Sequence, residues 1–324
     1  MTTTCRDALR AASGMLAQAG VPDPAVDAAF LLSHVTGTPH LLLRAEGWRE
    51  LTPAQLDAYQ ALLDRRCQRE PLQYILGTAQ FMGVTLRAQP GALIPRNDTE
   101  TLCEQALARM QGRERVLDLC TGTGALAIAI ALRFPGAQVT AADISADALA
   151  VARQNIADTG ARVTLRQGDL FAAVAGERFD IIVSNPPYIT AEEMADLQPE
   201  VCREPALALY GGSDGLDFYR RIAREAPDYL SPGGWLLLEI GSAQAEAVSA
   251  LLAERFEALA VYPDMQGLPR AVAARLRECE HIPLDCAIIS IFRAICTLKW
   301  KKRRVYSPAR LECWAGVCYN STVW

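Results

Sequence analysis

The first part of the chain carries apolar residues at helical spacing. Stretches such as ALRAASGMLAQAG, AVDAAFLLSHVTG and TPAQLDAYQALLDRRCQ repeat apolar positions every three or four residues, as amphipathic helices do. Thr52-Pro53 is a helix-start signal. The pattern predicts a small helical domain over residues 1–70. Glycines then divide residues 71–95 into short strand-like pieces, which predicts a β-hairpin linker.

Strand and helix patterns alternate between residues 96 and 278. Apolar runs such as RVLDL, QVTAAD, FDIIVSN and GWLLLEI are separated by amphipathic segments such as ADALAVARQNIA. This alternation predicts an α/β fold, with an open, largely parallel sheet and helices on both faces. Ligands of such folds bind beyond the carboxyl ends of the strands. The polar residues that follow these runs are therefore the candidate site residues.

Residues 279–324 differ in composition from the rest of the chain. Lysine occurs only at positions 299, 301 and 302, and half of the ten cysteines lie in this stretch. The rest of the chain uses arginine alone as its strong base. The change favours an atypical tail, frameshifted or disordered, over a native accessory segment.

Composition and charge narrow the classes of protein. A net charge of −5 and a pI near 5.4 argue against a protein that binds nucleic acid mainly through its phosphates. The sequence has no apolar run of about 18 residues, the length a membrane span requires. The cysteines form no C-x-x-C pair and the three histidines have no metal-ligand spacing. We therefore expect a cytoplasmic, monomeric protein without metal, membrane or stable nucleic-acid contacts.

A glycine turn follows the first of these strand-like runs, in RVLDLCTGTGALAIAIA. Gly122 and Gly124 allow a tight turn and the close approach of a ligand, towards which the next helix points its first amides. Asp143 ends the following strand, where a carboxylate can accept hydrogen bonds from ribose hydroxyls. These features fit NAD and S-adenosylmethionine equally well. Asp118 favours S-adenosylmethionine, because an acid repels a pyrophosphate and attracts an ammonium.

The stretch SNPPY, residues 184–188, follows the apolar run FDIIV. Proline donates no backbone hydrogen bond, so the two prolines stop the strand. The sequence resembles class I, Rossmann-like amino-methyltransferases, in which Asn or Asp, two prolines and Tyr or Phe bind a planar nitrogen. The Asn185 side-chain oxygen and the Pro186 carbonyl would accept the N–H hydrogens, and Tyr188 would pack against the planar group. Catalysis would then be orientation for in-line transfer, without a general base.

Longer stretches resemble one family, the release factor glutamine methyltransferases. The resemblance covers residues 5–276 in order. It implies an enzyme that uses S-adenosylmethionine to methylate the glutamine amide nitrogen in the Gly-Gly-Gln motif of class I peptide chain release factors, which modulates translation termination. It also implies that the helical domain recognises the protein substrate. The stretches are REPLQYILGTAQFMGVTL, LIPRNDTE, LDLCTGTGALAIAIA, VSNPPYI, EVCREPALALYGGSDGLDFYRRI, LLLEIG and DMQGLPR.

The resemblance also implies the roles of individual residues. Two positions depart from the family pattern: Cys120 stands where glycine is frequent, and Asn97 replaces a usual proline. The residues expected to bind the glutamine are Arg96, Glu100, Asn185, Pro186, Pro187 and Tyr188, with Asn185, Pro186 and Tyr188 as the catalytic ones. Those expected to bind the cofactor are Asp118, Cys120, Thr121, Gly122, Thr123, Gly124, Asp143, Asp169, Leu170 and Asn185.

Other functions are alternatives at this point. A related family methylates glutamine on a ribosomal protein with the same motif, and Thr99-Glu100 in PRNDTE favours the release factor family. Adenine N6 DNA methyltransferases use the motif on a flipped base, but they need a basic surface. GGSDG at 211–215 matches a hydrolase motif, although only His281 follows it. A binding protein without activity is the last alternative.

Overall fold

The computed structural model describes residues 3–43 and 45–278. The atypical tail predicted for residues 279–324 lies outside the described residues. Helices fill the first part of the chain, where the sequence predicts them. Thr52 begins one of them with a capping box, because its hydroxyl accepts from the Gln55 N–H while the Gln55 side chain accepts from the Thr52 N–H. The helices are α1 (Cys5–Gln18), α2 (Pro24–Thr36), α3 (His40–Leu43), α4 (Pro53–Cys67) and α5 (Leu72–Leu76).

A short hairpin follows the helices. Strand β1 (Thr78–Phe81) pairs with antiparallel β2 (Val84–Arg87). Met82 and Gly83 join them, both with positive φ, 50° and 75°. Two central residues of positive φ are typical of the type I′ turn, whose twist matches that of paired strands. The hairpin lies within the segment for which the sequence predicts one.

A seven-stranded sheet organises the rest of the described chain, and it confirms the predicted α/β fold. Its strand order is β5-β4-β3-β6-β7-β9-β8. The first five strands in this order are parallel, while β9 and β8 are added antiparallel at one edge. The strands are β3 (Arg115–Leu119), β4 (Gln138–Asp143), β5 (Val163–Gln167), β6 (Phe179–Ser184), β7 (Leu230–Glu239), β8 (Phe256–Pro263) and β9 (Pro269–Leu276).

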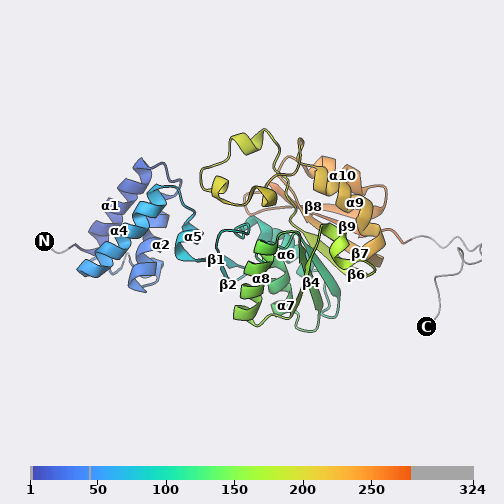
Figure 1. The fold of residues 1–324 in the computed structure, drawn as a ribbon, viewed down its shortest axis with the longest axis horizontal. Coiled ribbons are helices and arrows are strands. Elements are labelled where there is room, and N and C mark those ends of the chain that lie inside the picture. Colours follow the sequence, from blue (N-terminus) through green and yellow to red (C-terminus); the bar gives the residue numbers. More distant parts are fainter. Residues whose placement is uncertain (1–2, 44, 279–324) are drawn as a thin grey trace, which may run out of the picture. The chain divides into compact units, whose positions relative to one another are not determined.

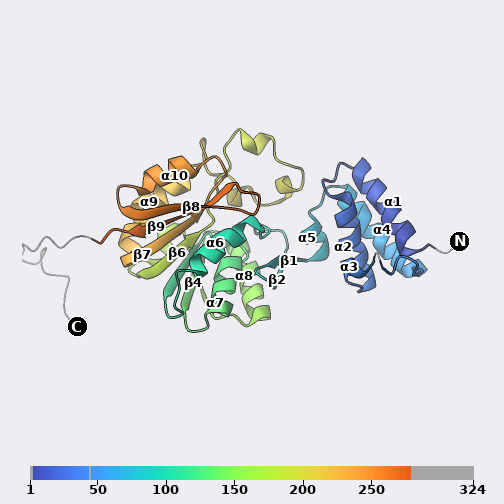
Figure 2. The same ribbon diagram turned by 180° about the vertical axis from the view of Figure 1, so that it is seen from behind.

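Helices cover both faces of this sheet (Figures 1 and 2). One face packs against α6 and α7 in one hydrophobic core, and α9 and α10 pack against the other face in a second core. The central strands are buried on both faces, so they are apolar almost throughout. The helices are α6 (Asp98–Leu107), α7 (Ala125–Arg133), α8 (Ala146–Thr159), α9 (Asp217–Tyr229) and α10 (Ala245–Leu252); short 3₁₀ helices are η1 (Leu170–Val174), η2 (Glu193–Ala195), η3 (Val201–Arg203) and η4 (Ala206–Ala208).

The sheet order changes direction beside β3. The chain runs outward from β3 through β4 to β5, then returns to place β6 on the other side of β3. At such a switch point the loops that follow the strands separate and leave a crevice at their carboxyl ends. Because β3, β4 and β6 are parallel, the loops that follow them all lie at the same edge of the sheet, around this crevice.

A buried ion-pair network joins the helical segment to the loop between β6 and α9. Arg66 of α4 pairs with Asp27 of α2 at 2.7 Å and with Glu200 at 2.8 Å, and Arg69 pairs with Glu200 at 2.6 Å. The Arg66 and Glu200 side chains are 5% and 12% exposed. Charges removed from water in this way require close partners.

Residues 3–43 and 45–278 contain neither a helix suited to cross a membrane nor a cluster of metal-ligating side chains. None of their helices combines the length and the apolar character that a membrane crossing needs. In the same part of the chain, no group of three or more His, Cys, Asp or Glu side chains could hold a metal ion.

Candidate active site

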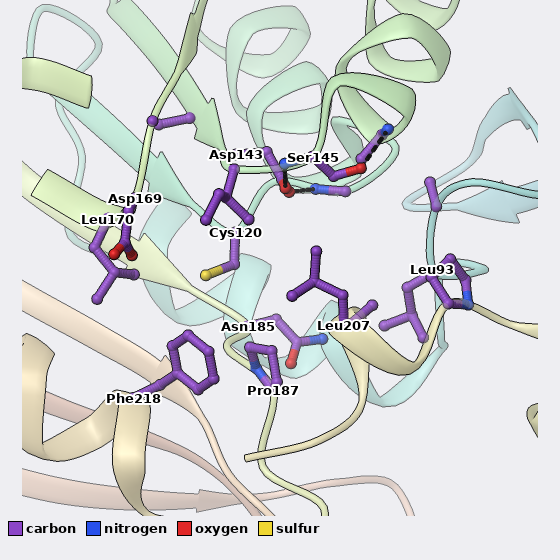
Figure 3. A pocket seen from close by; sticks show the side chains of 18 of the residues that line it. Leu93, Cys120, Asp143, Ser145, Asp169, Leu170, Asn185, Pro187, Leu207 and Phe218 are labelled. Carbon is purple, nitrogen blue, oxygen red and sulfur yellow. Dashed lines mark hydrogen bonds between the residues drawn. The ribbon is translucent and has the colours of Figure 1, made fainter. Parts of the chain in front are cut away.

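The loops that follow β3, β4 and β6 surround one open pocket (Figure 3). Cys120 and Gly122 come from the first loop, Asp143 from the end of β4, and Asn185 from the residue after β6. These residues lie close together because the carboxyl ends of parallel strands share one edge of the sheet. Apolar side chains form much of the remaining wall. The lining also includes Leu93, Ile144, Ser145, Asp169, Leu170, Pro187, Pro205, Leu207, Phe218 and Arg221.

The turn after β3 has the backbone geometry that glycine favours. Gly122 has φ of 55° and Gly124 has φ of 82°, which residues with a Cβ rarely adopt. Cys120 also has a positive φ, 57°. Glycine is therefore the residue that fits this position without strain, which gives a physical reason for the glycine that the resemblance leads us to expect there.

Asp143 is held in place by two backbone amides. Its Oδ2 accepts from Gly122 N and its Oδ1 from Ser145 N, both at 2.9 Å. Burial raises the Asp143 pKa, and these amide hydrogen bonds oppose the shift. Each carboxylate oxygen has a second lone pair. Asp143 can therefore hold the turn and still accept hydrogen bonds from a ligand's hydroxyl groups.

Asp118 lies beneath the turn and does not line the pocket. It is fully buried, and its Oδ2 accepts from the Thr121 hydroxyl at 2.6 Å and from Ala127 N at 3.2 Å. Its Oδ1 has no hydrogen-bond partner among the described residues. Burial raises the Asp118 pKa to about 7. In this arrangement Asp118 supports the turn and the start of α7, whereas the sequence suggested contact with a cofactor ammonium.

Thr121 and Thr123 are nearly buried and line a smaller pocket beside the first one. Asp169 and Leu170 also line the main pocket; they follow Gly168, whose N–H donates to the Asp143 carbonyl oxygen at 3.0 Å. Asp169 pairs with Arg221 at 2.9 Å, while Leu170 presents an apolar side chain (Figure 3). The main pocket therefore joins polar groups near Asp143 to an apolar wall, a combination that suits an adenosine-containing ligand.

Asn185 lines both pockets. Its Nδ2 donates to the Thr99 hydroxyl oxygen at 3.3 Å. This bond uses the donor end of the amide, so the acceptor Oδ1 is the end that remains for a ligand. Sequence patterns could not have identified Thr99 as the partner of Asn185, because the two residues are 86 positions apart.

The rest of the NPPY motif is divided between the pocket and the protein interior. Pro187 lines the main pocket, whereas Pro186 is buried outside its lining. Tyr188 packs at the edge of the second hydrophobic core. Its hydroxyl donates to Glu239 Oε1 at 3.4 Å, and burial raises the Tyr188 pKa. Tyr188 therefore contacts the protein itself, and its packing against a substrate amide stays a prediction.

Gln244 and two glycines fix the backbone that follows the motif. Gln244 Nε2 donates to the carbonyls of Tyr188 at 3.1 Å and Gly215 at 3.2 Å. A Cβ on Gly211 would lie 2.6 Å from Tyr188 Cα, and one on Gly215 would lie 2.3 Å from the Tyr188 carbonyl oxygen. The GGSDG stretch is therefore a close-packed support for NPPY, which explains its glycines without a hydrolase.

Arg96 and Glu100 make contacts within the protein. Arg96 forms an ion pair with Glu204, whose other carboxylate oxygen accepts from Ile94 N at 2.8 Å. Glu100 accepts from Met82 N at 2.6 Å and so holds the hairpin turn. Arg96 also lines the smaller pocket, in which a ligand could reach it.

Asn97 precedes α6 with φ of −61°. Proline fixes φ near this value, so the backbone keeps the conformation that the usual proline would impose. The replacement of proline at this position is therefore compatible with the fold.

Comparisons with known proteins place curated members of one family among the similar sequences. The chain matches the family models described as PrmC N-terminal domain, over residues 7–77, and methyltransferase small domain, over residues 97–209. A release factor glutamine methyltransferase from Geobacter sulfurreducens is 44% identical over 275 residues, which cover 84% of this chain and 97% of the relative. One from Cereibacter sphaeroides is 47% identical over 274 residues, 83% of this chain and 98% of the relative. A solved release factor-specific protein-(glutamine-N5) methyltransferase from Alicyclobacillus acidocaldarius is 33% identical, with a TM-score of 0.37 over 60% of this chain and 99% of that one.

Proposed function

We propose that this chain, which belongs to the release factor glutamine methyltransferase family, transfers a methyl group from S-adenosylmethionine to a glutamine side-chain amide nitrogen. The glutamine is that of the Gly-Gly-Gln motif in class I peptide chain release factors. One observation carries this proposal beyond family membership. Asn185 lines the pocket that the glycine turn and Asp143 also line, and its Nδ2 donates to Thr99, which leaves Oδ1 as its acceptor for a ligand.

The residues around the pocket fit S-adenosylmethionine. Asp143 supplies acceptors for ribose hydroxyls, and Ile144, Leu170 and Phe218 supply an apolar wall for a flat base. Cys120 and Gly122 allow close approach of the ligand to the backbone. S-adenosylmethionine contributes a methyl group bonded to a positively charged sulfur. No cation site is needed, because the reaction requires neither a metal nor a redox step.

Catalysis by this chain is mainly orientation. An amide nitrogen is a weak nucleophile, because its lone pair is delocalised into the carbonyl. Asn185 Oδ1 and the Pro186 carbonyl oxygen accept the two N–H hydrogens of the glutamine and direct its nitrogen towards the pocket. Such alignment of reacting groups can supply several kcal/mol of the barrier, about 7–11 in the best cases. The N–C bond would form as the bond between the methyl carbon and the sulfonium sulfur breaks, which leaves a neutral thioether, and one N–H proton would leave to water.

We also propose roles for the parts of the chain. Residues 1–70 form a substrate-recognition domain, 71–95 a linker, and 96–278 the catalytic domain. Exposed apolar side chains support the first role, because Leu41 and Trp48 are 77% and 75% exposed and such residues often mark protein contacts. We propose that the protein acts as a monomer in the cytoplasm, where release factors work.

The test is transfer of label from methyl-labelled S-adenosylmethionine to a purified class I release factor. We expect labelling of the parent release factor and none of a variant whose motif glutamine is alanine. Asn185→Ala should reduce transfer by about 100-fold or more, while calorimetry should still detect cofactor binding. A matched assay addresses the related family by offering, as acceptor, the unmethylated form of the ribosomal protein that this family methylates on glutamine. Label on the ribosomal protein alone would contradict the proposed substrate, and full activity of Asn185→Ala would contradict the mechanism.

A further inference from the structure

Two segments that are far apart in the sequence contribute to the lining of the main pocket. Residues 91–93 come from the stretch between β2 and α6, and three of residues 205–208 come from the loop between β6 and α9. Figure 3 shows Leu93 and Leu207 on the side of the pocket away from Leu170. The shape of the pocket therefore depends on how these two segments are held relative to each other.

The loop that contains the 205–208 segment has little apolar packing of its own. Between residues 191 and 210, only Glu204 and Leu209 are buried, with 5% and 6% exposure. Leu207 is 56% exposed, although it lines the pocket. A segment with few buried apolar contacts opens at a low cost in free energy. The position of this segment in the folded protein therefore depends mainly on its polar contacts.

Glu204 joins the two segments directly. It precedes the 205–208 segment, and its side chain is 1% exposed. Its Oε2 accepts from Ile94 N at 2.8 Å, while its Oε1 pairs with the Arg96 guanidinium. Ile94 immediately follows the 91–93 segment. A carboxylate that is removed from water needs close partners of this kind, and both partners lie on the stretch that carries the other segment.

Other polar contacts attach each segment to the first part of the chain. The Tyr74 hydroxyl, on α5, donates to the Ala92 carbonyl oxygen at 3.3 Å. Arg203 donates to the Gln68 carbonyl oxygen, just after α4, at 2.6 Å. These contacts hold each segment to the helices, whereas Glu204 holds the two segments to each other.

We propose that Glu204 is a positioning residue that fixes the 91–93 and 205–208 segments relative to each other and so completes the wall of the cofactor pocket. This inference rests on the proposed function, because S-adenosylmethionine is the ligand assigned to this pocket. Glu204 is not among the residues that line the pocket, so it acts through those that follow it, such as Leu207. A wall that is already in place loses little conformational freedom when a ligand binds. Without the carboxylate, binding has to order the wall, and the affinity falls.

Isothermal titration calorimetry with S-adenosylmethionine tests this role without requiring methyl transfer. Glu204→Gln keeps the shape of the side chain, but its amide offers one acceptor oxygen and an NH2 group, so either Ile94 N or Arg96 loses its partner. We expect the Kd for S-adenosylmethionine to rise by about 10-fold. Glu192→Gln makes the same chemical change at an exposed residue of the same loop and should keep the parent Kd. A parent-like Kd in Glu204→Gln would overturn the proposal.

A second control separates positioning from a general loss of stability. Leu252 of α10 is 1% exposed and lies outside the pocket lining, so Leu252→Ala should destabilise the protein through a cavity and leave the Kd unchanged. If Leu252→Ala raised the Kd as much as Glu204→Gln, loss of stability would explain both effects and the proposal would be wrong. Hydrogen exchange of the ligand-free protein adds an independent readout. The amides of residues 208–210, which are hydrogen-bonded within the loop, should exchange faster in Glu204→Gln than in the parent.

Leu207→Ala shortens the wall itself at an exposed position, so this variant should fold and should raise the Kd. A parent-like Kd in Leu207→Ala would overturn the proposal even if Glu204→Gln failed to fold. In the double variant Glu204→Gln/Leu207→Ala the two increases should not multiply, because both changes remove the same contact with the ligand. Increases that multiply would show that Glu204 does not act through Leu207.

The methyl-transfer assay then separates this proposal from the proposed function. With saturating S-adenosylmethionine, the kcat of Glu204→Gln should lie within about threefold of the parent value, because the candidate catalytic residue Asn185 is unchanged. A large fall in kcat with an unchanged Kd would contradict a role in the cofactor wall. A parent protein that binds S-adenosylmethionine and methylates no release factor would contradict the proposed function, and the binding test of Glu204 would still hold.

Discussion

The Asp143 carboxylate accepts a 2.9 Å hydrogen bond from the backbone N–H of Gly122. This bond joins the end of β4 to the glycine turn after β3, so the two candidate cofactor-binding segments are one unit. The other carboxylate oxygen accepts from Ser145 N, just before α8. A ligand that contacts Asp143 therefore meets a carboxylate that is already oriented, and little conformational freedom is lost on binding.

Asp143→Ala should weaken binding of S-adenosylmethionine. The substitution removes the acceptor for a ligand hydroxyl and leaves the Gly122 amide without its carboxylate partner. Hydrogen bonds to a charged group are worth about 1.5–3 kcal/mol, so we expect the Kd to rise by about 10- to 100-fold. Isothermal titration calorimetry measures the change.

Asp158→Ala is the control for this experiment. Asp158 lies on an exposed part of α8 and pairs with Arg87 of β2. It is outside the lining of the pocket, so its removal should leave the Kd for S-adenosylmethionine unchanged. An equal loss of affinity in both variants would mean that general destabilisation, and not the Asp143 contact, causes the effect.

Cys120→Gly should cost little stability, although it removes a partly buried side chain. The positive φ of Cys120, 57°, costs a residue with a Cβ roughly 1–2 kcal/mol, and glycine relieves this strain. The gain offsets the lost packing and the greater freedom of glycine in the unfolded chain. We expect the free energy of unfolding to change by less than about 1 kcal/mol, as urea denaturation would measure.

Cys103→Gly provides the comparison. Cys103 is fully buried in the interior of α6, where glycine both leaves a cavity and lowers helix propensity. It should lose about 2 kcal/mol or more. If Cys120→Gly were equally damaging, strain at Cys120 would not be the reason that glycine is frequent there.

The strand pattern was sufficient to predict the centre of the site. Asp143 and Asn185 each follow an apolar run, and parallel strands place such residues at the same edge. The turn around Gly122 is local, so its glycines predict its shape. These residues do meet at one pocket. Their roles in binding and transfer stay predictions that the proposed variants test.

The supporting residues could not be predicted in the same way. Thr99 of α6 accepts from Asn185, and Glu239 at the end of β7 accepts from Tyr188; no local pattern encodes either contact. Arg96 was expected to contact substrate, yet its charge is paired with Glu204, 108 positions later. Long-range pairing of polar groups depends on tertiary geometry, so the sequence indicates only that these residues are polar.

Glu200→Gln should lower stability at neutral pH and have little effect in acid. Burial opposes ionisation of Glu200, but hydrogen bonds from Arg69 and Arg66 outweigh it and lower its pKa from 4.5 to about 2. Because the pKa of Glu200 is lower in the folded state than in the unfolded chain, its ionised carboxylate stabilises the folded protein at pH values above 4.5. This stabilisation is lost as the pH falls from 4.5 towards 2. A shift of this size corresponds to about 3 kcal/mol.

Urea denaturation of the parent and Glu200→Gln at neutral pH and at about pH 2, the folded-state pKa, measures this difference. The two proteins should differ at neutral pH and converge in acid. Glu192→Gln removes an exposed carboxylate from the same loop and serves as the control. A difference between parent and Glu200→Gln that does not depend on pH would contradict the assignment of the Glu200 pKa.

Gly215→Ala should reduce kcat by displacing the NPPY backbone. A Cβ at this position would lie 2.3 Å from the Tyr188 carbonyl oxygen and 2.6 Å from Gln244 Nε2, and the φ of Gly215 is +72°. The loop must move to avoid this contact, and a small misplacement of positioning groups can cost about 100-fold in rate. Gly160→Ala imposes nearly the same φ, +70°, with no atom within 4 Å of the new Cβ. It should lose about 1–2 kcal/mol of stability and keep the parent kcat. Because the two variants share backbone strain and differ in the contact with Tyr188, equal kcat values in the methyl-transfer assay would show that the position of this loop does not limit catalysis.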